Sequence, residues 1–183
     1  MTRTVAILAT LLLAGCLPFQ STRETSKFVR LSVDVPSENR GSVYPAPVTT
    51  ATAPAYLEES TIWSSDPEGR LTAIKGFLWA ESLPDAVRRG FVLLLAQDQP
   101  FPDDLRIDLR IDRFLLLRDG SASAVLEAVV TRKGSVHSLP IIRVDTENVW
   151  DPENPETFLD GYRDLLRESG KKLEDLISSL DKN

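Results

Sequence analysis

Cysteine and histidine are nearly absent from this 183-residue chain, in which each occurs once, as Cys16 and His137. One cysteine cannot form an internal disulfide, so no disulfide framework is expected to hold the fold. One cysteine and one histidine also cannot supply the usual nitrogen and sulfur ligands of a zinc site. We therefore expect neither a structural metal nor a cofactor.

Basic residues are also in deficit, with 21 lysines and arginines against 27 aspartates and glutamates. Nucleic-acid binding requires a basic face that neutralises phosphates, so the balance argues against nucleic acid as the main partner. The same balance argues against adsorption to an anionic membrane through a basic patch.

Catalytic motifs are missing as well: the chain contains no G-x-S-x-G, P-loop, G-x-G-x-x-G or H-E-x-x-H sequence. His137 falls on a predicted strand, with no nucleophile motif nearby. Asp108 and Asp112 are best explained as the solvated face of a strand with cross-strand charge pairs. A further acidic group complements the dipole at a helix start and matches no EF-hand loop: Asp151, Glu153 and Glu156. We expect no enzyme activity.

No apolar run reaches the roughly 20 residues that a transmembrane helix needs. The N-terminal run from Val5 to Leu13 instead follows Arg3 and ends at small residues, as a secretory signal does. Its ending, LAGC at residues 13–16, resembles a bacterial lipobox, in which Cys16 is lipidated and begins the mature protein. The simpler alternative is a plain signal peptide with a chance cysteine.

The chain therefore divides into three parts. Residues 1–15 are a lipoprotein signal peptide, residues 16–27 are a lipidated N-terminus and polar tether, and residues 28–183 are one folded domain. Leu17 favours the periplasmic face of the bacterial outer membrane, because an aspartate there would favour inner-membrane retention in enteric-type sorting. Two or three acyl chains would make such anchoring durable.

Hydrophobic periodicity predicts strands and helices in the folded part. Residues 105–111 alternate strictly between apolar and charged side chains, which is typical of a strand with one wet face, and a bulge is expected near Arg113. The other strands are expected at Phe28–Val35, Val48–Ala53, Ser60–Trp63, Arg70–Ile74, Ser121–Thr131 and Val136–Val144, the last at an edge or bulged at Pro140.

Helical spacing of apolar residues predicts two helices, at residues 83–96 and from Phe158 towards the C-terminus. Ser82 and Asp85 have the form of a capping box for the first. The order of elements indicates an α+β fold, a mainly antiparallel sheet with two helices packed on one face.

Aromatic residues are few, at 7% of the chain, and three lie close together in the sequence: Tyr56, Trp63 and Trp79. They are expected either to pack under the first helix or, with Leu57, to form a partner interface, where tryptophan and tyrosine are enriched.

The segments PAYLEESTIW and FLWAESLPDAVRRGFVLLLA resemble the ABC-type transport auxiliary lipoproteins, the PqiC-like family. The matching elements are a Pro-x-Tyr-Leu element (Pro54, Tyr56, Leu57), the pair Ile62-Trp63, and a Trp-Ala-Glu-x-Leu element (Trp79, Ala80, Glu81, Leu83). The later DLRIDLRIDRF resembles the family's long strand. Leu78 departs from the basic or polar residue usual before the tryptophan, and residues 36–47 match nothing.

The resemblance implies a lipid-anchored periplasmic accessory subunit that docks a lipid transport system at the outer membrane and supports envelope integrity. Its partners would be an MCE-type periplasmic protein and ABC transporter or permease subunits, and a homo-oligomer stays open. The alternative is a stand-alone envelope scaffold or assembly lipoprotein. A third idea, lipid carriage in a cavity of the sheet, is disfavoured by the charged strand face.

Overall fold

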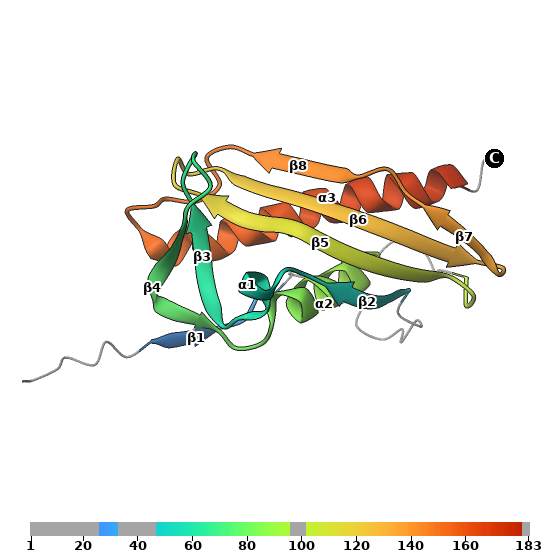
Figure 1. Ribbon diagram of the computed structural model, residues 1–183, viewed down its shortest axis with the longest axis horizontal. Coiled ribbons are helices and arrows are strands. Elements are labelled where there is room, and N and C mark those ends of the chain that lie inside the picture. Colours follow the sequence, from blue (N-terminus) through green and yellow to red (C-terminus); the bar gives the residue numbers. More distant parts are fainter. Residues whose placement is uncertain (1–25, 33–46, 96–101, 181–183) are drawn as a thin grey trace, which may run out of the picture.

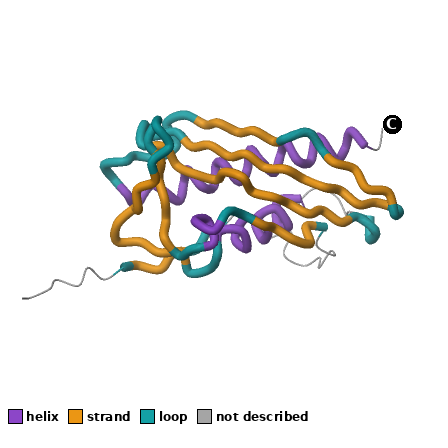
Figure 2. Tube along the Cα trace, viewed as in Figure 1, coloured by secondary structure: helices purple, strands orange, loops and turns teal. Residues whose placement is uncertain are grey.

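An eight-stranded mixed sheet forms the centre of the domain, and helices pack on one of its faces (Figures 1 and 2). The structure is a computed structural model and describes residues 26–32, 47–95 and 102–180. The predicted α+β class is confirmed. In chain order the elements are β1 (Lys27–Val29), β2 (Val48–Thr52), α1 (Ala55–Glu58), β3 (Thr61–Ser65), β4 (Leu71–Trp79), α2 (Leu83–Leu95), β5 (Arg106–Leu117), β6 (Ala122–Arg132), β7 (Ser135–Ser138), β8 (Ile142–Thr146), a 3-10 turn (Pro155–Thr157) and α3 (Phe158–Leu180).

The long antiparallel hairpin of β5 and β6 is the central element of the sheet. Each of its strands carries two short neighbours along its outer edge, β2 and β3 on β5, and β7 and β8 on β6. The strand order is β1-β4-β3-β5-β6-β7, with β2 and β8 off this path. Three pairings are parallel, namely β1 with β4, β2 with β5, and β3 with β5, so the sheet is mixed although mostly antiparallel.

Alternation along β5 decides which face is buried. Ile107, Leu109 and Ile111 are buried on the helix side, while the charged residues between them are largely exposed. α3 lies behind β5 and β6 in Figure 1 and covers this apolar face with one buried stripe. The stripe consists of Phe158, Gly161, Tyr162, Leu165, Leu166, Ser169, Gly170, Leu173 and Ile177. Because α2 packs against both α3 and β2, both long helices share one face of the sheet, as predicted.

Several local predictions are confirmed. The register of β5 against β6 shifts between Ile111 and Arg113, which is the expected bulge. Ser82 Oγ accepts a hydrogen bond from the Asp85 amide at 3.3 Å at the start of α2, as expected for a capping box. Gly120 adopts a φ of 88° in the turn between β5 and β6, a conformation that glycine adopts at little cost.

Three strand predictions need correction. The single strand expected at Val136–Val144 is two strands, β7 and β8, because Pro140 has no N–H to donate to the ladder. β1 ends at Val29, earlier than the expected Val35, and residues 33–35 lie outside the described residues. The strand expected at Val48–Ala53 ends at Thr52, and the segment after it forms a single-turn helix, α1, that is not among the predicted helices.

None of the helices in residues 26–32, 47–95 and 102–180 is long and apolar enough to cross a bilayer.

Candidate functional site

The residues predicted as a partner interface do not share one surface. Leu57 and Trp79 are each 3% exposed and belong to the hydrophobic core, whereas Tyr56 and Trp63 are half-buried at its margin. Trp79 is therefore buried as the packing interpretation expected, although against α3 and not the first long helix, and Leu57 is buried and not part of an interface. The interface hypothesis rests on Tyr56 and Trp63. Cys16, the predicted lipid-attachment residue, lies outside the described residues.

Trp79 is held in an aromatic cluster between the sheet and α3. Its ring lies edge-on to Tyr162, with centroids 5.1 Å apart, and edge-on to Phe158 at 6.0 Å. Phe77 approaches Phe158 at 5.1 Å, and Phe114 stacks on Tyr162 at 5.9 Å. Such pairs contribute about 0.5–1.5 kcal/mol each beyond burial of their area, so Trp79 stabilises the fold.

The face of the sheet away from the helices can be identified residue by residue. Phe114 stacks on Tyr162 of α3, and Leu116 lies where a Cβ on Gly161 of α3 would meet it. Successive side chains of a strand point to opposite faces, so Leu115 faces away from α3. We call this side of the sheet the outward face.

One row of residues crosses the outward face from β4 to β8. Ser64 of β3 pairs with Leu116 of β5 in parallel register, so the preceding residues, Trp63 and Leu115, are also aligned. With the registers of the other strands, the row consists of Ala73, Trp63, Leu115, Ser123 and Asp145. Leu115 and Ser123 are 5% and 2% exposed although no described helix covers them. We attribute their burial to neighbouring side chains, with the large indole of Trp63 beside them.

A second row continues the apolar surface towards the turn end of the sheet. Leu71 of β4 pairs with Ser65 of β3, and Ser65 pairs with Leu117 of β5. Leu71 is exposed and Leu117 is half-buried. Together with the neighbouring row they form what we call the outward patch: Trp63, Leu71, Leu115 and Leu117.

Tyr56 lies on α1, which contacts β3 and α2, and it is close enough to the buried Tyr162 to raise the pKa of that hydroxyl. Burial raises the pKa of the Tyr56 hydroxyl, Arg113 lowers it and Asp112 raises it. Asp112 and Arg113 lie at the β5 bulge, so Tyr56 is near this bulge. The Trp63 Nε1–H is buried and has no hydrogen-bond partner among the described residues. An unpaired buried donor is costly.

The N-terminal half of β5 presents charges on the outward face instead. Asp108 Oδ1 accepts hydrogen bonds from the hydroxyls of Thr49 and Thr50, each at 2.7 Å. Arg110 lies 3.0 Å from the Asp112 carboxylate and 3.6 Å from that of Glu127 on β6. The predicted cross-strand charge pairing is therefore only partly present: Arg110 pairs with Glu127 across strands, whereas Asp112 pairs with Arg110 of its own strand and Asp108 is bound by threonine hydroxyls.

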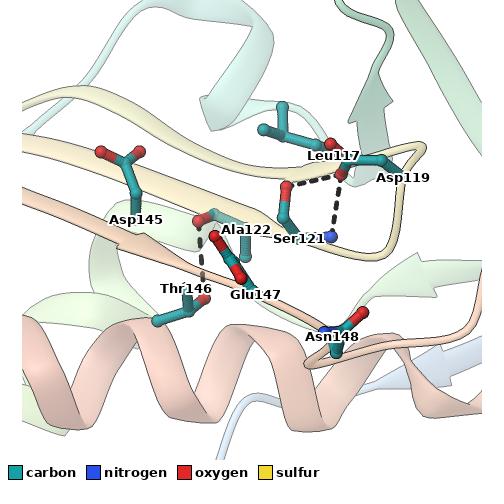
Figure 3. A pocket seen from close by; sticks show the side chains of 8 residues that line it. All are labelled: Leu117, Asp119, Ser121, Ala122, Asp145, Thr146, Glu147 and Asn148. Carbon is teal, nitrogen blue, oxygen red and sulfur yellow. Dashed lines mark hydrogen bonds between the residues drawn. The ribbon is translucent and has the colours of Figure 1, made fainter.

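A shallow pocket of about 430 Å³ opens beside the β5–β6 turn (Figure 3). Three carboxylates line it, and Figure 3 shows Asp119 and Asp145 at opposite sides with Glu147 between them. Asp119 Oδ1 accepts hydrogen bonds from the amide and the hydroxyl of Ser121, which lowers the pKa of its carboxyl. Sequence reasoning did not find this pocket, because it is formed by a turn and the end of β8, 26 residues apart.

A second pocket, of about 340 Å³, lies between the start of β8 and α3. Its apolar lining includes Ile141, Ile142 and Leu176, and its charged rim includes Lys172 and Asp175. Lys172 Nζ donates to the main-chain oxygen of Arg143 at 2.5 Å, which joins α3 to this edge strand. No sequence pattern indicates this pocket, because it lies where the single strand predicted at Val136–Val144 is interrupted at Pro140.

No group of three or more histidine, cysteine, aspartate or glutamate side chains is placed to hold a metal ion within residues 26–32, 47–95 and 102–180. His137 lies exposed on β7. In the acidic group before α3, Asp151 Oδ1 accepts a hydrogen bond from the Glu153 amide, and Glu156 pairs with Lys27 at 3.2 Å.

The fold recurs in solved structures, although no protein-family model and no curated protein matches the chain. A crystal structure of an uncharacterized protein superposes with a TM-score of 0.66 at 14% identity, covering 84% of this chain and 99% of that one. A Xanthomonas campestris protein of the DUF330 family superposes with a TM-score of 0.63 at 14% identity, covering 85% of this chain and 98% of that one. At this identity the likeness concerns the fold alone.

Proposed function

We propose that this protein is a lipid-anchored accessory subunit of an ABC/MCE-type lipid transport system, held on the periplasmic face of the outer membrane. In this role the domain binds an MCE-type periplasmic protein and so docks the transport assembly at the membrane. The domain provides a surface that binds the MCE-type protein at the outer membrane, and the ABC subunits supply the energy for transport.

The membrane part of the proposal is supported by the N-terminal sequence. The apolar run that ends in LAGC at residues 13–16 has the order of a lipobox, and the residues after it form a polar tether. Acyl chains on Cys16 would keep the domain at a bilayer surface, because each buried CH₂ contributes about 0.8 kcal/mol.

The partner part rests on one observation, the outward patch. It presents a tryptophan and a leucine, Trp63 and Leu71, on a face that no described helix covers. Tyr56 belongs to α1, which contacts the strand β3 that carries Trp63. Aromatic residues ringed by polar ones are typical centres of protein interfaces. One of the residues that carry the family resemblance, Trp63, belongs to this patch.

Site-specific photo-crosslinking in the native bacterium tests this. In one version of the full-length chain p-benzoylphenylalanine replaces Tyr56. In the control version it replaces Val136, an exposed residue of β7. We expect the probe at position 56 to capture an MCE-type protein, identified by mass spectrometry, and the probe at position 136 to capture several-fold less. Trp63→Ala should weaken capture from position 56.

The scaffold alternative predicts a different result. If both probes capture only structural envelope proteins, or no MCE-type subunit is captured by a chain whose Cys16 is lipidated, the transport proposal is wrong. Native mass spectrometry of the mature lipoprotein addresses lipid carriage separately, because a carrier would retain a lipid in addition to its covalent acyl chains.

A further inference from the structure

Phe28 is the only exposed aromatic side chain in the described part of the chain, with 69% of its surface accessible. An exposed phenylalanine contributes nothing to a monomeric core and costs free energy by ordering water. It lies on β1, twelve positions after Cys16. Because Phe28 is this close in sequence to the predicted lipid anchor, the residues around it indicate which surface covers its ring.

β1 is an edge strand, at one end of the strand order, and pairs with β4 in parallel. Lys27 is aligned with Phe77, and its Nζ lies 5.7 Å from the centre of that ring, while Val29 is aligned with the buried Trp79. Because neighbouring residues of a strand point to opposite faces, Phe28 projects away from this aromatic cluster.

Cationic residues precede and follow Phe28 in the sequence, with Lys27 over the Phe77 ring on the other face of β1. The side chains of Lys27 and Arg30 are each 68% exposed. Lys27 pairs with the exposed Glu156, and Arg30 lies 3.3 Å from Glu81. Arg89 also contacts Glu81.

The segment after β1 is fastened to the domain. Arg89 Nη2 of α2 donates to the Leu31 carbonyl at 2.7 Å, and Arg163 Nε of α3 donates to the Ser32 carbonyl at 3.3 Å. The Ala80 amide donates to the Val29 carbonyl at 2.8 Å. The direction of Phe28 is therefore fixed relative to the sheet.

We propose that Phe28, flanked by Lys27 and Arg30, is a membrane-contact surface that rests on the bilayer carrying the acyl chains of Cys16. This inference builds on the proposed function, because it needs the lipid anchor. Twelve extended residues span at most about 43 Å, so the anchor keeps β1 within reach of the membrane surface. An aromatic ring suits the interface, and lysine and arginine direct their charged ends to lipid phosphates.

The contact also orients the domain. Figure 1 places β1 and β7 at opposite ends of the molecule, and they are likewise the two ends of the strand order. With Phe28 at the bilayer, β7 is at the end of the molecule away from the membrane. The acidic remainder of the domain opposes close adsorption, so the contact is confined to the β1 end.

Depth measurement by spin labelling tests the proposal with a matched control. Phe28→Cys and Val136→Cys introduce a thiol at sites that are 69% and 67% exposed in the native chain. The Cys16 sulfur is occupied by its lipid in the mature lipoprotein, so a nitroxide reports only the new position. Each labelled lipoprotein is reconstituted in vesicles of equal parts phosphatidylcholine and phosphatidylglycerol, and the accessibility of the nitroxide to oxygen and to a nickel chelate is compared by power saturation.

We expect the ratio of oxygen to nickel accessibility at position 28 to exceed that at position 136 by several-fold. Equal, water-like ratios at both positions, in vesicles that carry the lipoprotein, would overturn the membrane contact while leaving the anchor intact. A chain that fails to associate with vesicles, with an unmodified Cys16 by mass spectrometry, would instead refute the anchor and with it the proposed function. Unchanged circular dichroism of both variants shows that the labels report on the native fold.

Discussion

Tyr162 Oη donates a hydrogen bond to the main-chain oxygen of Trp63 at 3.2 Å, joining two residues that are 99 positions apart. Tyr162 belongs to α3 and is fully buried. Trp63 belongs to β3, and its side chain is part of the outward patch on the opposite face of the sheet. The bond crosses the core and fixes the strand against the helix. The position of the proposed docking surface therefore depends on a residue that no partner can touch.

Tyr162→Phe is expected to lower the free energy of unfolding by about 1–2 kcal/mol at neutral pH, because it leaves the Trp63 carbonyl without its donor. Equilibrium unfolding in urea measures this. Tyr56→Phe is the matched control, since it removes the hydroxyl of a half-buried tyrosine and should change stability by less than about 0.5 kcal/mol. Equal losses in both variants would contradict the assignment.

The same side chain makes stability depend on alkaline pH. Burial raises the pKa of the Tyr162 hydroxyl far above its ordinary value of 10.0, with a smaller contribution from Tyr56. The folded state then holds the proton where the unfolded state releases it, so this stabilisation is complete below pH 10.0 and is lost as the pH rises further. Urea unfolding above that pH should show a shallower decline for Tyr162→Phe than for the wild type.

Two glycines of α3 allow a test of how closely the helix packs. A Cβ on Gly161 would stand 2.7 Å from Leu116 Cδ2, inside the core, whereas one on Gly170 would meet Leu94 Cδ1 of α2 at 3.0 Å. Leu116 is fully buried and Leu94 is half-buried, so only Leu94 has room to move.

Gly161→Ala is expected to destabilise the protein by about 1–3 kcal/mol through overpacking. Gly170→Ala should be close to neutral, because the gain in helix propensity of about 1 kcal/mol offsets a small shift of Leu94. Thermal unfolding of the two variants gives the comparison. A Gly161→Ala variant as stable as the wild type would show that α3 does not approach β5 this closely.

Much of this architecture follows from local periodicity. Leu105, Ile107, Leu109 and Ile111 alternate with charges, and that pattern alone predicts a long strand with one wet face, as β5 proves to be. The apolar stripe of α3 and the cap at Ser82 are local in the same way. These features could be predicted because residues near in sequence determine them.

Features set by distant contacts could not be predicted. The parallel pairings of β1 with β4 and of β2 with β5 join segments about 50 to 60 residues apart, and no local pattern encodes them. Leu115 is buried on the outward face because register brings Trp63 beside it. No local pattern distinguishes Trp79 from Trp63. Alternation along their strands places Trp79 in the core and Trp63 at its margin.

Asp108 links β2 to β5 and gives stability an acid dependence. Hydrogen bonds from Thr50 and Thr49 lower the pKa of its carboxyl below the ordinary 3.8. The contribution is therefore present above pH 3.8 and disappears as the pH falls through the lowered value. Asp108→Asn should reduce stability at neutral pH by less than about 1 kcal/mol, since the site is exposed.

The difference between Asp108→Asn and the wild type should shrink when urea unfolding is repeated below pH 3.8. Asp112→Asn is the control on the same strand, where the carboxylate pairs with Arg110 and not with threonine hydroxyls. If the two variants behave identically at both pH values, the threonine hydrogen bonds do not contribute to stability.

Arg89 and Arg88 are neighbours on α2 with different contacts. Comparing them tests what holds residues 30–32, which follow β1, against the domain. Arg89 contacts Glu81 and donates to the Leu31 carbonyl, whereas Arg88 lies 4.0 Å from Asp85 on its own helix. Arg89→Ala should speed amide hydrogen exchange around residues 30–32 by about tenfold or more, because a hydrogen bond from a charged donor contributes roughly 1.5 kcal/mol. Arg88→Ala should leave exchange there unchanged. Faster exchange throughout the sheet in Arg89→Ala would mean that the arginine supports the whole fold, and the fixed direction of Phe28 would need another explanation.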